Sequence, residues 1–259
     1  MSFLLKKISV LSCLIISSFI FSEEWKIYPG VSAQDDIQSA MILAQEGDTI
    51  FLAAGIYNLN HGLSLDVDNI ILKGEGHKNT VLNFSEQKTG AQGLLVTSND
   101  VILKDFAVEN AKGDAIKSKG SKNIKFLNLR TEWTNGPDTK NGAYGLYPVE
   151  SEDVLIDGCI AIGASDAGVY VGQSENIIVR NTEAYFNVAG IEIENSYYAD
   201  VYDNVAENNT AGILVFDLPD LPKQGGKFVR VFNNISSNNN TENFAPEGNI
   251  VGQVPKGTG

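Results

Sequence analysis

One short phrase recurs along the second half of the chain and constrains the fold more than any other feature. It reads Gly-Val-Tyr-Val-Gly at 168–172, Gly-Ile-Glu-Ile-Glu at 190–194 and Gly-Ile-Leu-Val-Phe at 212–216, with a variant at 145–149. The leading glycines of the four phrases are 23, 22 and 22 residues apart. A repeat of this length is typical of a solenoid, in which each repeat forms one coil that stacks on the last.

Apolar residues alternate with other residues inside each phrase, as Val169 with Val171 and Ile191 with Ile193 show. A period of two predicts a short strand with one inward face, and β-branched residues suit such a strand. A leucine-rich repeat has a similar length, but it needs a regular leucine frame and an asparagine at a fixed offset, which are missing here. The pattern therefore predicts an all-β chain folded as a right-handed parallel β-helix.

A second apolar phrase marks the start of each coil and sets the coil number. The starts are Ile70, Val101, Ile124, Val154, Ile177, Ala199 and Val229, which gives steps of 22–31 residues. Short polar residues recur at matching offsets, at Asp105, Asn128, Asn181, Asp203 and Asn233. Because such side chains tolerate left-handed turns, we expect about seven coils over residues 50–250, with turns at these positions.

The first 22 residues read as a signal peptide, with Lys6 and Lys7 before an apolar stretch. Residues 23–259 then form one β-helix domain. No later stretch is apolar enough to cross a membrane, so we expect an exported protein that is periplasmic or secreted.

Both ends of the solenoid need a cover, since an open coil exposes apolar residues and unpaired strand edges. Residues 36–45 read as a short amphipathic helix that Asp35-Asp36 caps, which would cover the first coil. At the other end, Gly257-Thr258-Gly259 stands where the next phrase would start. We therefore expect that the domain lacks a C-terminal cap, or that a partner covers this end.

The charge balance excludes some partners. The chain has 32 acidic and 19 basic residues and a net charge of −13, which becomes −15 without Lys6 and Lys7. A nucleic-acid partner is excluded on this ground, and polyanionic polysaccharides would be repelled. The only histidines are His61 and His77, and Cys159 is the only cysteine after residue 22. We therefore expect no metal site and no cofactor, and a buried Cys159.

The outward positions of the repeated phrases should line up in two rows on one face. The first row is Lys117, Tyr147, Tyr170, Glu192 and Leu214, and the second is Lys119, Val149, Gly172, Glu194 and Phe216. Extra residues at 85–92, 132–142 and 217–226 are expected to form loops, which often build the binding face of a solenoid.

Aromatic rings and carboxylates on one exposed strip are suited to sugars, because rings stack on sugar faces and carboxylates bind hydroxyls. The candidate substrate-binding residues are Trp133, Tyr147, Tyr170, Glu194 and Asp217. The alternative is that stacked tyrosines and ion pairs only stabilise the ladder, or that the face is flat and docks a protein.

The sequence resembles the pectin-lyase-like right-handed β-helix superfamily over residues 30–250. The resemblance is carried by residues 47–50 (Gly-Asp-Thr-Ile), residues 54–57 (Ala-Gly-Ile-Tyr) and the glycine-anchored coils. Members of that superfamily include polysaccharide lyases, alginate C5-epimerases and periplasmic accessory proteins. The resemblance implies the β-helix fold and leaves the activity open.

Residues 144–150 (Tyr-Gly-Leu-Tyr-Pro-Val-Glu) are similar to the Tyr-Gly-Phe-Asp-Pro-His-Glu signature of the alginate epimerases. Tyr147 and Val149 replace the aspartate and histidine of that signature, whereas Lys117 stands where the epimerases keep a lysine that neutralises the uronate. The resemblance thus implies a lyase- or epimerase-like reaction if the chain is an enzyme. With Glu192 from the strip, Lys117 and Tyr144 form the candidate catalytic set.

The chain is also similar to a group of exported bacterial β-helix proteins that tend to be encoded beside an exported haem-containing protein. This similarity is carried by residues 147–151, 166–174, 189–196 and 212–219. Two functions follow as hypotheses. The chain binds or acts on a carbohydrate through the Lys/Tyr/Glu strip, or it is a non-catalytic envelope scaffold that docks a protein partner, possibly the haem-containing one.

Overall fold

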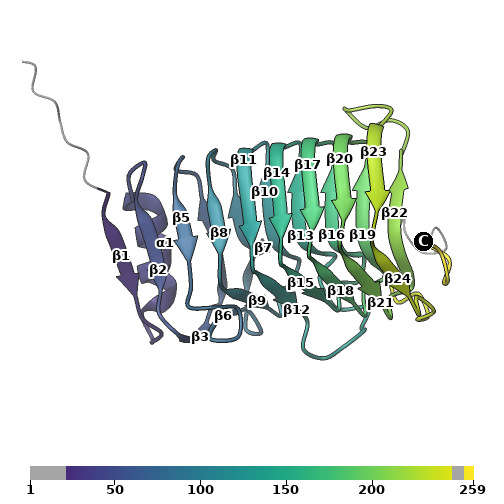
Figure 1. The fold of residues 1–259 in the computed structure, drawn as a ribbon. Coiled ribbons are helices and arrows are strands. Elements are labelled where there is room, and N and C mark those ends of the chain that lie inside the picture. Colours follow the sequence, from purple (N-terminus) through teal and green to yellow (C-terminus); the bar gives the residue numbers. More distant parts are fainter. Residues whose placement is uncertain (1–21, 247–253) are drawn as a thin grey trace, which may run out of the picture.

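The computed structural model describes residues 22–246 and 254–259. Residues 1–21 of the expected signal peptide lie outside this range, so that expectation stays a prediction. The described chain contains the helix α1 (Ala33–Leu43) and 24 strands in three sheets. From β2 onward, successive strands fall in different sheets, so the chain winds around a common axis (Figure 1).

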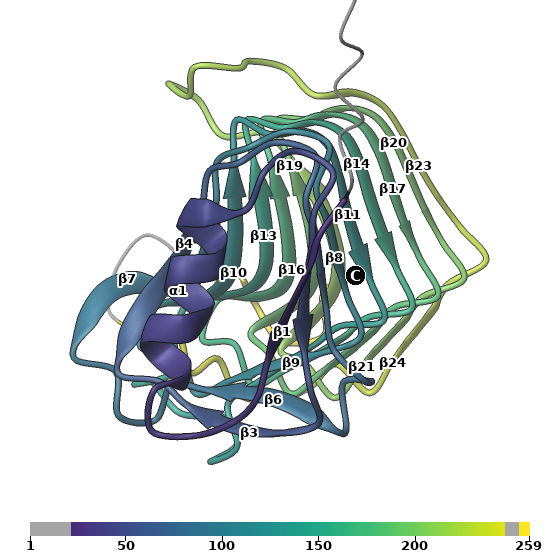
Figure 2. The same cartoon turned by 90° about the vertical axis from the view of Figure 1, so that its left-hand side faces the viewer.

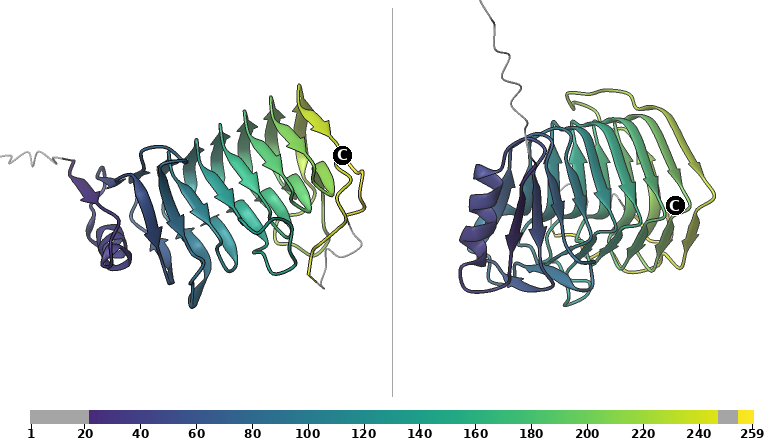
Figure 3. Two further views of the ribbon diagram at one scale, coloured as in Figure 1. Left: turned by 90° about the horizontal axis from the view of Figure 1, so that it is seen from below. Right: turned by 60° about the vertical axis from the view of Figure 1, so that its left-hand side comes forward.

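Each sheet is one side of the solenoid. Sheet 1 contains β1 (Glu24–Ile27), β2 (Thr49–Leu52), β5 (Ile71–Lys73), β8 (Ile102–Lys104), β11 (Lys122–Leu127), β14 (Glu152–Asp157), β17 (Glu175–Arg180), β20 (Tyr197–Tyr202) and β23 (Lys227–Phe232). Sheet 2 contains β4 (His61–Leu65), β7 (Thr89–Val96), β10 (Asp114–Lys119), β13 (Tyr144–Val149), β16 (Ala167–Gly172), β19 (Ala189–Glu194) and β22 (Ala211–Phe216). Sheet 3 contains β3 (Gly55–Asn58), β6 (Thr80–Asn83), β9 (Ala107–Glu109), β12 (Arg130–Glu132), β15 (Ile160–Ile162), β18 (Glu183–Tyr185), β21 (Val205–Glu207) and β24 (Ile235–Ser237). The three sides are visible in the two views of Figure 3.

The repeated phrases form neighbouring parallel strands of sheet 2, as predicted. Val169 pairs with Ile191, and Ile191 pairs with Ile213. Val169 and Ile191 are fully buried, and Ile213 packs against the same core. The inward side chains of all three sheets form one continuous apolar core along the axis. The predicted β-helix is therefore confirmed.

The glycine that opens each phrase allows close contact between coils. A Cβ atom on Gly145 would lie 2.4 Å from the carbonyl oxygen of Gly168, and one on Gly190 would lie 2.7 Å from that of Gly212. No side chain fits at such distances, so glycine recurs at the first position of the phrase because the neighbouring coil leaves no room for a Cβ atom.

The predicted turn residues adopt the left-handed backbone conformation that the sequence indicates. Their φ angles lie between 49° and 61°, at Asp105, Asn128, Asn181, Asp203 and Asn233. Their side chains also form a ladder along the axis, in which the Asn128 amide donates a 2.6 Å hydrogen bond to the carboxylate of Asp105. Short polar residues thus satisfy each turn and link it to the next coil.

Helix α1 covers the N-terminal end of the solenoid (Figure 2). Its Ile37, Ala40 and Met41 side chains are buried and join the core. The helix begins at Ala33, three residues earlier than predicted, and Asp35 and Asp36 lie in its first turn instead of capping it. Carboxylates at that place still stabilise the helix through its dipole.

At the other end, Thr258 forms a parallel bridge with Ala211 of β22. Residues 257–259 therefore begin to extend sheet 2 where the sequence predicted a new phrase. The expectation that this end lacks a cap stays a prediction, because residues 247–253 lie outside the described chain.

Candidate functional site

Two buried ladders fix the strands that carry the predicted strip. Just before β19 and β22, Asn187 donates a 3.0 Å hydrogen bond to Asn209, and Asn209 donates a 3.1 Å bond to Asn239. Just after β16 and β19, the backbone N–H of Ser174 donates to the hydroxyl of Ser196 at 3.1 Å. Because these polar groups are buried and satisfied, they hold neighbouring coils in one register.

This register brings the predicted row together. Lys117 pairs with Tyr147, Tyr170 pairs with Glu192, and Glu192 pairs with Leu214. The prediction that the strip is exposed is wrong. Tyr170, Glu192 and Glu194 are only 6%, 2% and 5% exposed, while Lys117 and Tyr147 are half-buried.

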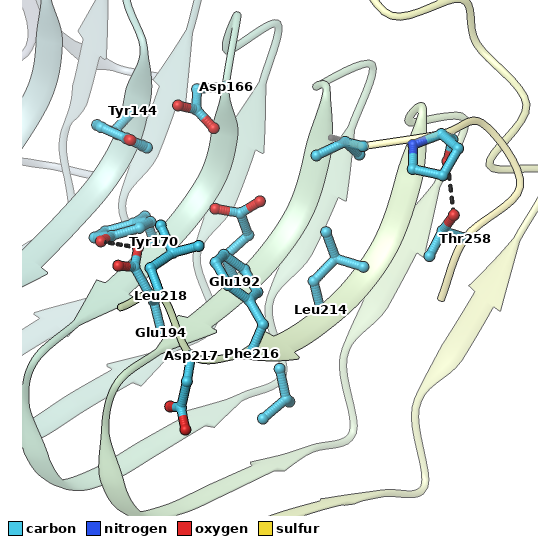
Figure 4. Close-up of a pocket in the computed structure, with 13 residues that line it drawn as sticks. Tyr144, Asp166, Tyr170, Glu192, Glu194, Leu214, Phe216, Asp217, Leu218 and Thr258 are labelled. Atoms are coloured by element: carbon cyan, nitrogen blue, oxygen red, sulfur yellow. Dashed lines mark hydrogen bonds between the residues drawn. The ribbon is translucent and has the colours of Figure 1, made fainter. Parts of the chain in front are cut away.

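The cover over the strip comes from the loop at 217–226 and from residues 254–258. The buried Asn195 holds the loop in place: its amide donates to the carbonyl oxygens of Leu218 and Lys223, both at 2.9 Å, and accepts from the N–H of Leu218 at 2.8 Å. Asp217 is exposed and accepts a 2.7 Å hydrogen bond from Gly226, which closes the loop. A cavity of about 440 Å³ remains beneath this cover (Figure 4).

Trp133 does not lie at the edge of the strip, and that prediction is wrong. The side chain is 3% exposed, belongs to the apolar core and donates a 2.7 Å hydrogen bond from Nε1 to the carbonyl of Ala111. It follows β12 directly, at a turn position where a large ring can fill the interior of the coil. Burial of its large apolar surface outweighs any gain from exposure to a ligand.

Three tyrosines form a cluster beside the cavity. The ring centroids of Tyr144 and Tyr147 are 4.5 Å apart, those of Tyr144 and Tyr170 are 4.6 Å apart, and those of Tyr147 and Tyr170 are 4.9 Å apart. Burial raises the pKa of Tyr147 to about 12, and it raises those of Tyr144 and Tyr170 further. All three phenols therefore stay protonated near neutral pH, and the Tyr170 hydroxyl donates a hydrogen bond to Glu194.

Lys117 lies at the far side of this cluster and does not line the cavity. Its Nζ atom is 4.2 Å from the centroid of the Tyr147 ring and 3.6 Å from the carboxylate of Asp114. The charge of Lys117 is thus already balanced by a carboxylate and an aromatic face.

The sequence prediction missed Asp166, which joins Glu192 and Glu194 at the cavity. Asp166 stands two residues before Gly168, in the turn that leads into β16. The matching positions in the other phrases hold Ala143, Val188 and Thr210. A single acid among small and apolar residues is the signal that could have identified it.

Burial and repulsion from neighbouring carboxylates raise the pKa values of all three acids. The pKa of Asp166 rises to about 7, mainly because of burial, with a further contribution from Glu194. Burial and the charges of Asp166 and Glu194 raise the pKa of Glu192 well above its usual value. Burial also raises the pKa of Glu194, although the hydroxyl of Tyr170 donates a hydrogen bond to its carboxylate and favours the ionised form.

The cavity thus holds three acids whose pKa values are raised above their usual range, an arrangement that suits proton transfer. Among residues 22–246 and 254–259, no group of three or more metal-binding side chains has the geometry to hold a metal ion. Within the same residues, no helix is long and apolar enough to cross a membrane.

A family model described as "Right handed beta helix region" matches residues 68–240. The chain belongs to this family. In the curated relatives, the preneck appendage protein of Bacillus phage PZA is 24% identical over 229 residues, which covers 80% of this chain and 25% of the phage protein. The chain thus spans about a quarter of the length of that relative.

Solved structures of β-helix proteins have the same fold. The premature form of gene product 12 of bacteriophage phi29 matches with a TM-score of 0.69 and 16% identity, over 80% of this chain and 31% of the phage chain. The polygalacturonase of Erwinia carotovora ssp. carotovora matches with a TM-score of 0.63 and 12% identity, over 83% of this chain and 77% of the enzyme. At these identities the similarity establishes the fold alone.

Proposed function

We propose that the chain binds a carbohydrate in the cavity of sheet 2 and hydrolyses a glycosidic bond by acid–base catalysis. The observation that carries this proposal is the group formed by Asp166, Glu192 and Glu194 in a cavity of about 440 Å³. Tyr144 and Tyr170 line the same cavity, where their rings can contact a sugar beside these acids. Glycoside hydrolysis commonly uses two carboxyl groups that differ in protonation state.

The environments of the two glutamates suggest different roles. The raised pKa of Glu192 favours its protonated form, which can donate a proton to the leaving oxygen. The hydrogen bond from Tyr170 favours ionised Glu194, which can activate water or attack the anomeric carbon. The two residues lie two positions apart on β19, with Cα atoms roughly 6.6 Å apart, so their carboxyl groups can flank one bond.

A lyase or epimerase reaction has less support than hydrolysis. Such a reaction needs a neutralised uronate carboxylate and a base that removes a proton. Lys117 is paired with Asp114 outside the cavity, and burial keeps Tyr144 protonated. The acids of the cavity would also repel a uronate.

A panel of neutral, amino and acidic polysaccharides, with assay of new reducing ends, tests the proposal. We expect turnover of at least one non-uronate substrate, and a loss of roughly 100-fold or more in Glu192→Gln and Glu194→Gln, because each would remove a proton-transfer group. Glu152→Gln is the matched control, since this exposed carboxylate lies on sheet 1. The proposal fails if none of these polysaccharides binds, or if the two variants retain full activity on a substrate that does bind.

A second candidate function is the docking of a protein on sheet 1, and an unusual pair of aromatic residues favours it. The rings of Tyr198 and Phe228 stack 5.0 Å apart, and the side chains are 53% and 66% exposed. Their φ angles of 55° and 58° are left-handed, and each residue is the second of its strand, where the earlier strands β14 and β17 hold Asp153 and Asn176 in the same conformation. The left-handed conformation is energetically unfavourable for large side chains, and backbone strain of this kind often occurs at binding sites.

Sedimentation of the protein over a range of concentrations tests whether a second copy is that partner. Self-association that is lost in the double variant Tyr198→Asn/Phe228→Asn supports docking through this pair. Asparagine suits the left-handed backbone conformation of these two positions, so the double variant should fold. A monomer at every concentration removes a second copy as the partner.

A further inference from the structure

The cavity of sheet 2 is lined by four acids and, among the described residues, by no basic side chain. Asp166, Glu192, Glu194 and Asp217 all contribute to its lining, and no lysine, arginine or histidine of residues 22–246 and 254–259 does. This imbalance is local, because the neighbouring cations have partners elsewhere. Lys223 contacts Glu175 and the ring of Tyr197, and Lys256 pairs with Glu242.

Two of these acids also have an oxygen without a partner among the described residues. Oε1 of Glu192 and Oδ1 of Asp166 are buried and make no hydrogen bond, and Glu192 is 2% exposed. Figure 4 shows that the two carboxyl groups point toward one another across the cavity. Buried polar atoms in native proteins nearly always have a partner, so these two oxygens need a hydrogen-bond donor, which a ligand in the cavity can supply.

We infer that the cavity binds a sugar unit with a free, protonated amino group, which donates hydrogen bonds to Asp166 and Glu192. This inference rests on the proposed function and specifies the class of substrate. An ammonium group carries three donors and one positive charge, so it satisfies both free oxygens and balances the acids. The tyrosine rings beside the cavity offer an apolar face to the sugar and attract its charge.

Other donors fit less well. A neutral hydroxyl can bond one oxygen, but it leaves the repulsion among the acids unchanged. A metal ion would need three or more ligands in a suitable geometry, which the described residues do not provide. An N-acetylated amino sugar has lost the charge, and a uronate adds a further negative one.

Calorimetric titration with three tetrasaccharides tests the inference. The ligands are β-1,4-linked glucosamine, β-1,4-linked N-acetylglucosamine and galacturonate, each at pH 6. We expect glucosamine to bind roughly tenfold more tightly than the acetylated tetrasaccharide, or better, and galacturonate to bind least. Glu192→Gln should remove most of this preference, with Asp166→Asn as a second variant and the exposed Glu46→Gln as the control.

Proton release gives an independent readout. At pH 6 a carboxyl group with a pKa of about 7, such as that of Asp166, is about 90% protonated. A bound ammonium lowers that pKa, so binding should release close to one proton. The release is measured from the change of binding enthalpy between buffers of different ionisation enthalpy.

The outcomes separate this inference from the proposed function. Equal or tighter binding of the acetylated tetrasaccharide, without proton release, overturns the inference and leaves a neutral glycan as the ligand. Competition by calcium alone at a similar affinity also overturns it, in favour of a metal. If no member of the wider polysaccharide panel binds either, the proposed function fails as well.

Discussion

The carboxyl group of Asp166 provides a direct test of the electrostatics of the cavity. Its pKa rises from an ordinary 3.8 to about 7, so the folded protein binds this proton more tightly than the unfolded chain does. The stability linked to this proton is fully present below about pH 4, and it is lost as the pH rises to about 7. At 1.36 kcal/mol per pKa unit, a shift of roughly three units corresponds to about 4 kcal/mol.

Asp166→Asn removes the titrating group and leaves a side chain of nearly the same shape. The variant and the wild type should therefore have similar free energies of unfolding at pH 4. At pH 8 the variant should be more stable than the wild type by up to about 4 kcal/mol. The gain is smaller than this maximum to the extent that the pKa shift of Asp166 comes from its coupling to Glu194 and Asp114. Because Asp166 is also a proposed ligand of the substrate, the gain in stability should accompany a loss of binding.

Denaturant unfolding at five pH values from 4 to 8 measures this difference. Asp153→Asn is the matched control, since this exposed aspartate lies on sheet 1, where asparagine suits its left-handed backbone. The control should show no comparable rise with pH. A difference between Asp166→Asn and wild type that stays flat with pH, or a variant that is less stable at pH 8, would refute the reasoning.

Three further substitutions test how the coils hold the site. Gly190→Ala should lower the free energy of unfolding by about 1–3 kcal/mol because its Cβ would lie 2.7 Å from a carbonyl oxygen, whereas Gly30→Ala, with no atom within 4 Å, should change it little. Trp133→Ala should lower the free energy of unfolding by about 3–5 kcal/mol, measured by thermal or denaturant unfolding, because the ring is buried in the core. Ligand affinity should stay unchanged at temperatures well below the melting temperature. Asn195→Ala should speed hydrogen exchange at the Leu218 amide, because the loop loses its hydrogen bonds to Asn195. It should also lower the free energy of unfolding by about 1–3 kcal/mol, because buried polar groups lose their partners. Unchanged exchange at Leu218 would show that Asn195 does not hold the loop.

The sequence by itself determined the coil and the residues that face inward. Val169 and Ile191 alternate with outward residues, and alternation is a local property of any strand, so their burial could be read from the chain. The same holds for Asn128 and Asn181, because the left-handed turn is set by the preference of a single residue. Regular repetition then fixed the register, since each coil must match its neighbour.

The tertiary structure decided what covers the outward face. Alternation places Tyr170 and Glu192 outside the core, but their burial depends on the loop at 217–226 and on residues 254–258, which come from later in the chain. The pairing of β16 with β19 brings Asp166 to Glu192, and burial raises the pKa values of both. Trp133 turned inward for a related reason, because the space inside a coil is set by all three sheets together and no local pattern reports it.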